Sequence, residues 1–176
     1  INEPVNGTSP IVFAADRDYY DIVSLILDKN PAADLGHKAL LVATERGRFR
    51  IVKLLIKKGA SINELFYEGS TLLHLACSGY GEDVISGKIT DEHYELVKLF
   101  LVRGINLNVR DKNGNTPLML AVALGYNNNS GEEIRLKIAK FLVEKGAEIN
   151  AKNKAGKSAL SIARENNYPG SDSAPL

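Results

Sequence analysis

The stretch that decides the fold reads Thr116-Pro117-Leu118-Met119-Leu120-Ala121. Proline is well tolerated in the first turn of a helix, so this stretch predicts a helix start followed by an apolar face. The 176-residue chain carries four related stretches: Ser9-Pro10-Ile11-Val12-Phe13-Ala14, Lys38-Ala39-Leu40-Leu41-Val42-Ala43, Thr71-Leu72-Leu73-His74-Leu75-Ala76 and Ser158-Ala159-Leu160-Ser161-Ile162-Ala163. Five copies of one pattern predict a repeat protein.

A second apolar segment follows each of the first four copies, at residues 22–26, 51–55, 96–100 and 138–142. Its apolar residues recur at i, i+1, i+3 and i+4, which predicts an amphipathic helix. Three of these helices are expected to close at Gly59, Gly104 and Gly146, and the first at Asn30. Each unit is thus predicted to be two short antiparallel helices and a turn, which can bury their apolar faces only by stacking.

The alanines at positions 14, 43, 76, 121 and 163 give successive spacings of 29, 33, 45 and 42 residues. The 33-residue period agrees in phase with the helix-opening Thr116-Pro117-Leu118, the closing Gly59-Ala60-Ser61-Ile62-Asn63 and a Gly-x-Thr/Ser pattern at Gly69, Gly114 and Gly156. In these features nearly the whole chain resembles the ankyrin-repeat family. The resemblance implies an all-α ankyrin-repeat solenoid, in which helix-turn-helix units are joined by β-hairpin-like turns.

We expect one domain over residues 1–170, with units at about 7–35, 36–68, 69–113, 114–155 and 156–168 and a tail at 171–176. The last unit stops after its first helix, because Asn166-Asn167-Tyr168-Pro169-Gly170 breaks the pattern. Repeats three and four are longer than 33 residues, and the excess falls between their helices, at residues 79–92 and 125–133. These segments are expected to be neighbouring loops with lengthened helix ends.

Composition narrows the class of protein. Hydrophobic residues make up 44% and charged residues 24%, as in soluble globular proteins. With 22 Lys and Arg against 21 Asp and Glu, the net charge of +1 makes nucleic acid an unexpected partner. The single Cys77 cannot form an internal disulfide, and the apolar stretches are too short to span a bilayer. We therefore expect a cytoplasmic monomer with no membrane contact, or alternatively a secreted bacterial effector that acts in a host cell. Because Ile1 is not an initiator Met, we also expect processing or excision from a longer chain.

Candidate catalytic and metal-binding residues are few. His74 and Cys77 lie three apart on a predicted helix, but two ligands fall short of the three or four that zinc requires. The family resemblance implies instead that His74 hydrogen-bonds around Thr71. His93 lies near four acidic residues, whose spacing does not match an oxygen-ligand loop for calcium. We expect no catalytic residue, no metal and no cofactor.

The resemblance implies that a partner binds at the tips of the inter-repeat turns and on the exposed side of the first helices. The candidates at the turns are Glu64, Leu65, Phe66, Tyr67 and Glu68, then Arg110, Lys112 and Asn113, and then Lys152 and Lys154; those on the helices are Arg17, Glu45, Arg46 and Leu124. Along the turns the character changes from apolar and acidic to basic. This gradient suggests a matched ligand.

The sequence therefore predicts a non-enzymatic module that presents a rigid surface to another protein, with Phe66 and Tyr67 as anchors and the basic residues as electrostatic guides. Three alternatives stay open. The two aromatic residues could fold back onto their own turn, the chain could be the substrate-recruiting segment of a larger enzyme or bacterial effector, or the basic turns could bind polyanions and nucleic acid weakly.

Overall fold

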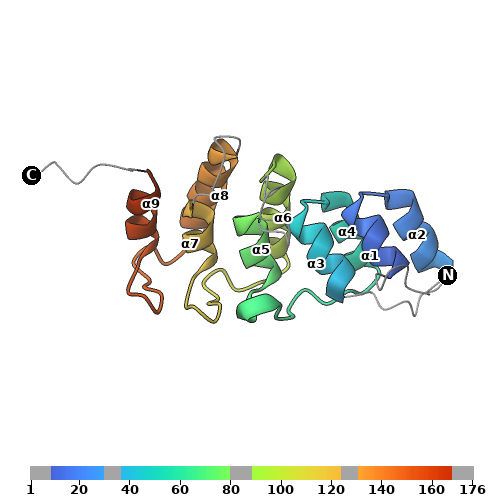
Figure 1. Ribbon diagram of the computed structural model, residues 1–176, viewed down its shortest axis with the longest axis horizontal. Coiled ribbons are helices and arrows are strands. Elements are labelled where there is room, and N and C mark those ends of the chain that lie inside the picture. Colours follow the sequence, from blue (N-terminus) through green and yellow to red (C-terminus); the bar gives the residue numbers. More distant parts are fainter. Residues whose placement is uncertain (1–8, 30–36, 80–88, 124–130, 168–176) are drawn as a thin grey trace, which may run out of the picture.

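The computed structural model describes residues 9–29, 37–79, 89–123 and 131–167. Its helices form a single row of pairs (Figure 1). In chain order they are α1 (Pro10–Asp16), α2 (Tyr20–Lys29), α3 (His37–Glu45), α4 (Phe49–Lys57), the short 3-10 helix η1 (Tyr67–Gly69), α5 (Leu72–Ser78), α6 (Asp91–Val102), α7 (Pro117–Val122), α8 (Glu132–Glu144) and α9 (Ala159–Asn167). Within these ranges no strand occurs, and no helix is long and apolar enough to cross a membrane.

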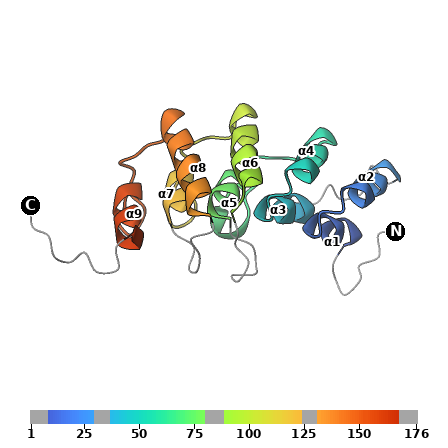
Figure 2. The same ribbon diagram turned by 90° about the horizontal axis from the view of Figure 1, so that it is seen from above.

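The helices stack in two layers. The first helices of the units, α1, α3, α5, α7 and α9, pack on one another in that order, and α2, α4, α6 and α8 form the second layer (Figure 2). Each second helix also packs on the first helix of its own unit. The prediction of an all-α stack of helix-turn-helix units is thus confirmed.

The core runs along the whole stack because each repeat supplies the same residue types at the same positions. The alanines that define the period, Ala14, Ala43, Ala76 and Ala121, are almost completely buried. Their small side chains let neighbouring first helices approach closely. Leucine at equivalent positions of three units fills the space between layers, at Leu40, Leu73 and Leu118.

The second helices α4, α6 and α8 are each tied to the preceding unit by one polar side chain near the N-terminal end. These side chains donate to the last carbonyl of the preceding first helix: Arg48 Nη2 to Asp16 O (3.2 Å), His93 Nε2 to Glu45 O (3.1 Å) and Arg135 Nη2 to Ser78 O (2.9 Å). The last carbonyls of a helix lack partners within it, so these bonds satisfy them.

The predicted insertions lie largely outside the described residues, but their bases are visible. Asp91 begins α6 and Glu132 begins α8, so residues 91–92 and 132–133 are helical, in agreement with the lengthened helix ends. Ile89 is buried, and a Cβ on Gly131 would lie 2.7 Å from its Cγ2 atom. The described C-terminal ends of the two insertions, at Ile89 and Gly131, therefore lie side by side.

Candidate protein-binding surface

The turns between repeats form one continuous edge, which we call the hairpin edge (residues 64–69, 109–114 and 151–156). The three tips close with the same backbone hydrogen bond: Phe66 N to Ser70 O (2.7 Å), Asp111 N to Asn115 O (3.0 Å) and Asn153 N to Lys157 O (2.9 Å). Neighbouring tips are bonded to each other, from Lys112 N to Glu68 O (2.7 Å) and from Lys154 N to Asn113 O (2.9 Å). The edge is therefore a rigid surface and not three separate loops.

Close contact between the tips restricts the residue types at their centre. Gly114 has a φ of 77°, and a Cβ at this position would lie only 3.1 Å from Lys154 N. Any other residue would be strained in this backbone conformation and would push the next tip away. The glycine thus allows the direct hydrogen bond between neighbouring tips.

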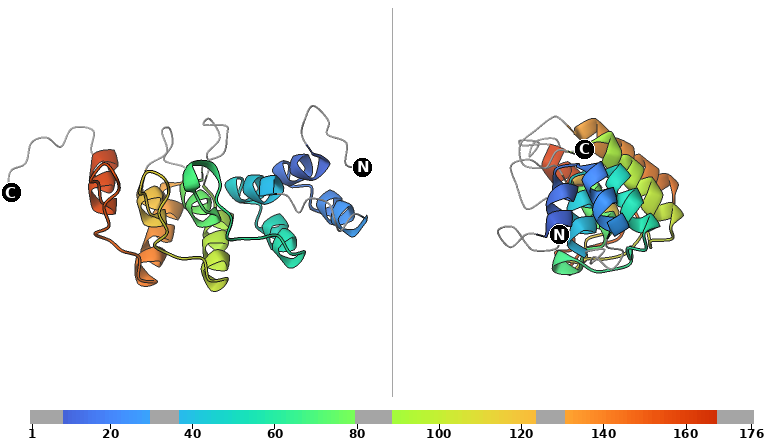
Figure 3. Two further views of the ribbon diagram at one scale, coloured as in Figure 1. Left: turned by 90° about the horizontal axis from the view of Figure 1, so that it is seen from below. Right: turned by 90° about the vertical axis from the view of Figure 1, so that its right-hand side faces the viewer.

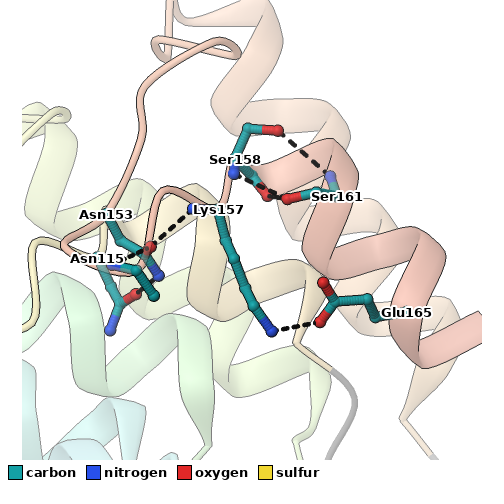
Figure 4. Close-up of polar contacts among 7 residues, drawn as sticks. Asn115, Asn153, Lys157, Ser158, Ser161 and Glu165 are labelled. Atoms are coloured by element: carbon teal, nitrogen blue, oxygen red, sulfur yellow. Dashed lines mark hydrogen bonds and ion pairs between the residues drawn. The ribbon is translucent and has the colours of Figure 1, made fainter.

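Side chains stabilise the second and third tips from within. Asp111 Oδ1 accepts the backbone N–H groups of Asn113 and Asn115, both at 2.8 Å. Asn153 Oδ1 likewise accepts from Lys157 N at 2.9 Å, and Asn153 Nδ2 donates to Asn115 Oδ1 at 2.8 Å (Figure 4). An aspartate or asparagine that accepts N–H groups two and four residues further on is a typical turn stabiliser.

The first tip has Phe66 where the other two have Asp111 and Asn153, and it is held differently. The ring of Phe66 is half-buried against the core and lies 4.7 Å from the His37 ring, while His37 forms an ion pair with Glu64. The start of α3 thus covers part of the Phe66 ring, and the role of this residue as an anchor stays a prediction. Leu65 and Tyr67 are exposed, at 63% and 57%.

The basic residues of the hairpin edge differ in their contacts. Lys112, Lys152 and Lys154 are exposed, and in the described part of the chain none of them forms an ion pair. Arg110 instead donates to Lys152 O at 2.7 Å and lies 3.8 Å from Glu148. Its guanidinium group therefore joins two hairpin turns, and its role as an electrostatic guide stays a prediction.

Comparison with known proteins agrees with this geometry. The sequence matches a family model described as ankyrin repeats (three copies) at residues 11–86 and again at residues 88–171. The chain belongs to the ankyrin-repeat family. Ankyrin repeats are in general protein–protein interaction modules, so a protein partner is expected on the same grounds.

Related ankyrin proteins come from distant sources. The chain is 32% identical to the ankyrin repeat protein FPV034 of fowlpox virus (strain NVSL), over 77% of this chain and 28% of that protein. It is 31% identical to the ankyrin repeat and KH domain-containing protein mask-1 of Caenorhabditis elegans, over 81% of this chain and 5% of that protein. It is 32% identical to human Rabankyrin-5, over 74% of this chain and 10% of that protein. The chain thus spans under a third of these relatives.

The first helices of the ankyrin stack offer less exposed surface than the sequence predicts. Arg17 is exposed, but Arg46 is only half-exposed, and its Nε donates to Asp16 Oδ1 at 2.9 Å. The prediction that Glu45 is exposed is wrong: it is buried at the end of α3, next to the first turn of α6. Leu124 lies outside the described residues. The three described positions, Arg17, Glu45 and Arg46, therefore form no common exposed patch.

Both histidines singled out in the sequence have structural roles in the ankyrin fold. His74 Nδ1 accepts the Thr71 N–H at 3.2 Å, and its Nε2 donates to Asn115 O at 3.0 Å. His93 repeats this arrangement with Thr90 N at 3.1 Å and Glu45 O. Burial lowers the pKa of both rings, so they are held neutral.

The role of His93 could have been found in the sequence, because Thr90-x-x-His93 repeats the spacing of Thr71-x-x-His74. In the sequence analysis, His93 is weighed only as a member of an acidic cluster and has no assigned structural role.

Cys77 is completely buried, and burial raises the pKa of its thiol. Within the described ranges, no three His, Cys, Asp or Glu side chains come together as metal ligands would.

Proposed function

We propose that the chain is a non-enzymatic binding module whose hairpin edge holds an acidic segment of a partner protein. The observation that supports this most directly is the pair of exposed side chains Leu65 and Tyr67 on a rigid edge. Turn tips have little structural use for large apolar groups, whereas a partner can bury them. The three lysines without ion pairs continue the same edge.

The two kinds of residue would act on different steps of binding. Burial of an aromatic anchor slows dissociation, because the anchor must be exposed to water again before the partner leaves. Exposed lysines attract an acidic partner over a distance and raise the association rate. Leu65 and Tyr67 are therefore the affinity residues of the proposal, and Lys112, Lys152 and Lys154 its guides.

The test uses crosslinking from positions that differ in place but not in exposure. A photo-reactive amino acid is placed at Tyr67 or at Val102, which is 83% exposed at the end of α6 and is not part of the hairpin edge. We expect a cellular protein to crosslink from position 67 alone. With that partner in hand, changing Leu65 and Tyr67 to alanine should weaken binding by about 2 kcal/mol without lowering the melting temperature. Equal crosslinking from both positions, or unchanged affinity of the double variant, would refute the proposal.

The same lysines favour a second candidate, the weak binding of polyanions. This candidate predicts that heparin and single-stranded DNA both bind, that the affinity falls steeply with salt, and that Leu65 and Tyr67 contribute nothing. Competition between heparin and the crosslinked partner separates the two functions. A partner displaced fully by heparin at physiological salt, with no effect of the apolar pair, would favour polyanion binding.

One relative supports a role within a larger enzyme. The E3 ubiquitin-protein ligase XBAT33 of Arabidopsis thaliana is 31% identical over 89% of this chain, which spans 30% of the ligase. A module of this kind would recruit the substrate while another domain carries out the chemistry. The proposed hairpin edge would serve both roles, so the crosslinked partner itself distinguishes them.

A further inference from the structure

The N-terminal end of the stack exposes a residue that every later repeat buries. Ile22 of α2 is 48% exposed, whereas the equivalent residues of the next three second helices, Ile51, Leu96 and Ile138, are all at 0%. In those repeats the preceding unit covers this position. Figure 3, in the view along the stack, shows α1 and α2 at the front with no helix before them.

Two more apolar residues enlarge this surface. Phe13 of α1 and Leu25 of α2 are exposed, while Leu75 and Leu54, their equivalents in later repeats, are buried or packed against the core. Terminal units that close a repeat stack normally have a polar outer face. The outer face of the first unit is apolar, so it has the character of an interface and not of a cap.

The outer face of the first unit also carries basic residues equivalent to those that join the second unit to the first. The second unit is held to the first by ion pairs from Arg46 to Asp16 (2.9 Å) and from Lys58 to Asp28 (2.8 Å). One repeat earlier, the positions of Arg46 and Lys58 are occupied by Arg17 and Lys29. Both basic side chains are exposed on the first unit; Arg17 is 62% exposed, although its Nε lies 3.5 Å from Asp16 Oδ2 and its guanidinium group lies over the Phe13 ring.

The match between the two faces is incomplete. Tyr19 and Asp21 stand where the second unit has Arg48 and Arg50, which contact the Asp16 carbonyl and the Tyr20 ring. The outer face of the first unit thus shares its apolar residues and two basic residues, Arg17 and Lys29, with the second unit. These shared residues determine which partner fits the face.

We propose that the outer face of α1 and α2 docks a further ankyrin-type helix pair of the same polypeptide, with acidic residues equivalent to Asp16 and Asp28. The charges and the apolar centre complement such a pair as repeat two complements repeat one. A helix pair of this length is not stable alone in water, so covalent linkage favours its docking over binding from solution. A second copy of this chain fits less well, because α9 ends the described stack without a second helix to cover Ile22.

The test inserts a second copy of residues 8–36 after residue 36 in the full chain. This copy is 29 residues long, which equals the spacing between Ala14 and Ala43 and keeps the repeats in register. The original first unit is then outermost, and it presents Asp16 and Asp28 to Arg17, Lys29 and Ile22 of the inserted copy, which adjoins repeat two. We expect one cooperative urea transition with a higher midpoint, and exchange of the α2 amide protons slowed about tenfold or more.

Matched variants show whether the proposed face causes the effect. Ile22→Asp and Arg17→Glu, placed in the copy that adjoins repeat two, should lower the midpoint of the duplicated chain and leave that of the parent chain nearly unchanged. Val102→Asp, far from this face, should act equally in both chains. A separate transition for the outermost unit, an unchanged midpoint, or equal effects of Ile22→Asp in both chains would overturn the proposal.

Sedimentation of the parent chain supplies an independent readout. We expect a monomer at all concentrations, because the face is suited to a linked repeat. Dimerisation that Ile22→Asp abolishes would assign the face to a second copy of the chain and would likewise overturn the proposal.

Discussion

Leu118 and Leu160 occupy the same position in consecutive repeats, yet their side chains differ in exposure. Leu118 of α7 is 3% exposed between its neighbours, whereas Leu160 of α9 is 54% exposed. Replacing each by alanine removes the same atoms from the same place in the pattern. The pair therefore measures what stacking alone contributes to stability.

The expected losses follow from these exposures. Leu118→Ala removes a fully buried side chain and leaves a cavity between α5, α7 and α9, so it should cost about 2 to 5 kcal/mol. Leu160→Ala forfeits about half of the 1.5 to 3 kcal/mol of a buried leucine, or about 0.7 to 1.5 kcal/mol, and leaves no closed cavity. The first loss should exceed the second at least about twofold.

Urea unfolding followed by circular dichroism measures both losses. With a slope of about 2.5 kcal/mol per molar urea, Leu118→Ala should lower the midpoint by about 0.8 to 2 M and Leu160→Ala by about 0.3 to 0.6 M. Equal shifts would refute the reasoning, because they would mean that α9 is covered as fully as α7 or that the repeat register is wrong.

The remaining predictions concern charge, pH and the insertions. Reversing Lys152 and Lys154 to glutamate should slow association with an acidic partner in stopped-flow measurements, and the loss should shrink as salt rises; a salt-independent loss would contradict electrostatic guidance. Burial lowers the pKa of His74 and His93 below 6.5, so the unfolded chain binds more protons below about pH 6.5. Stability should thus be complete above that pH and fall as the pH drops through it; a urea midpoint that is flat from pH 7.5 to 5 would argue against neutral histidines. Arg135 donates to the carbonyls at the bases of both insertions, at 2.9 and 3.2 Å, so Arg135→Met should cost about 1 to 3 kcal/mol and speed hydrogen exchange at both bases together; faster exchange at one base alone would show that they are independent.

The candidate site was predictable in place but not in detail. The repeat phase located the turn tips, since glycine and the turn residues are local signals. It did not show that Phe66 packs on His37 or that Arg110 joins two turns, because these contacts link residues far apart in the sequence. The sequence named Leu65, Phe66 and Tyr67 together, and only the structure showed that Leu65 and Tyr67 are exposed while Phe66 is half-buried.

The sequence by itself determined the repeat, its helices and their stacking order, because helix periodicity and helix-closing glycines act within a few residues of the chain. Only the tertiary structure decided which side chains face water. Ile22 and Ile51 are the same residue in the same helical pattern, yet one is half-exposed and the other completely buried. The difference lies in the preceding helix pair, which covers Ile51 and is not found over Ile22 in the described residues. Burial is a property of the neighbouring repeat, and no local pattern contains it.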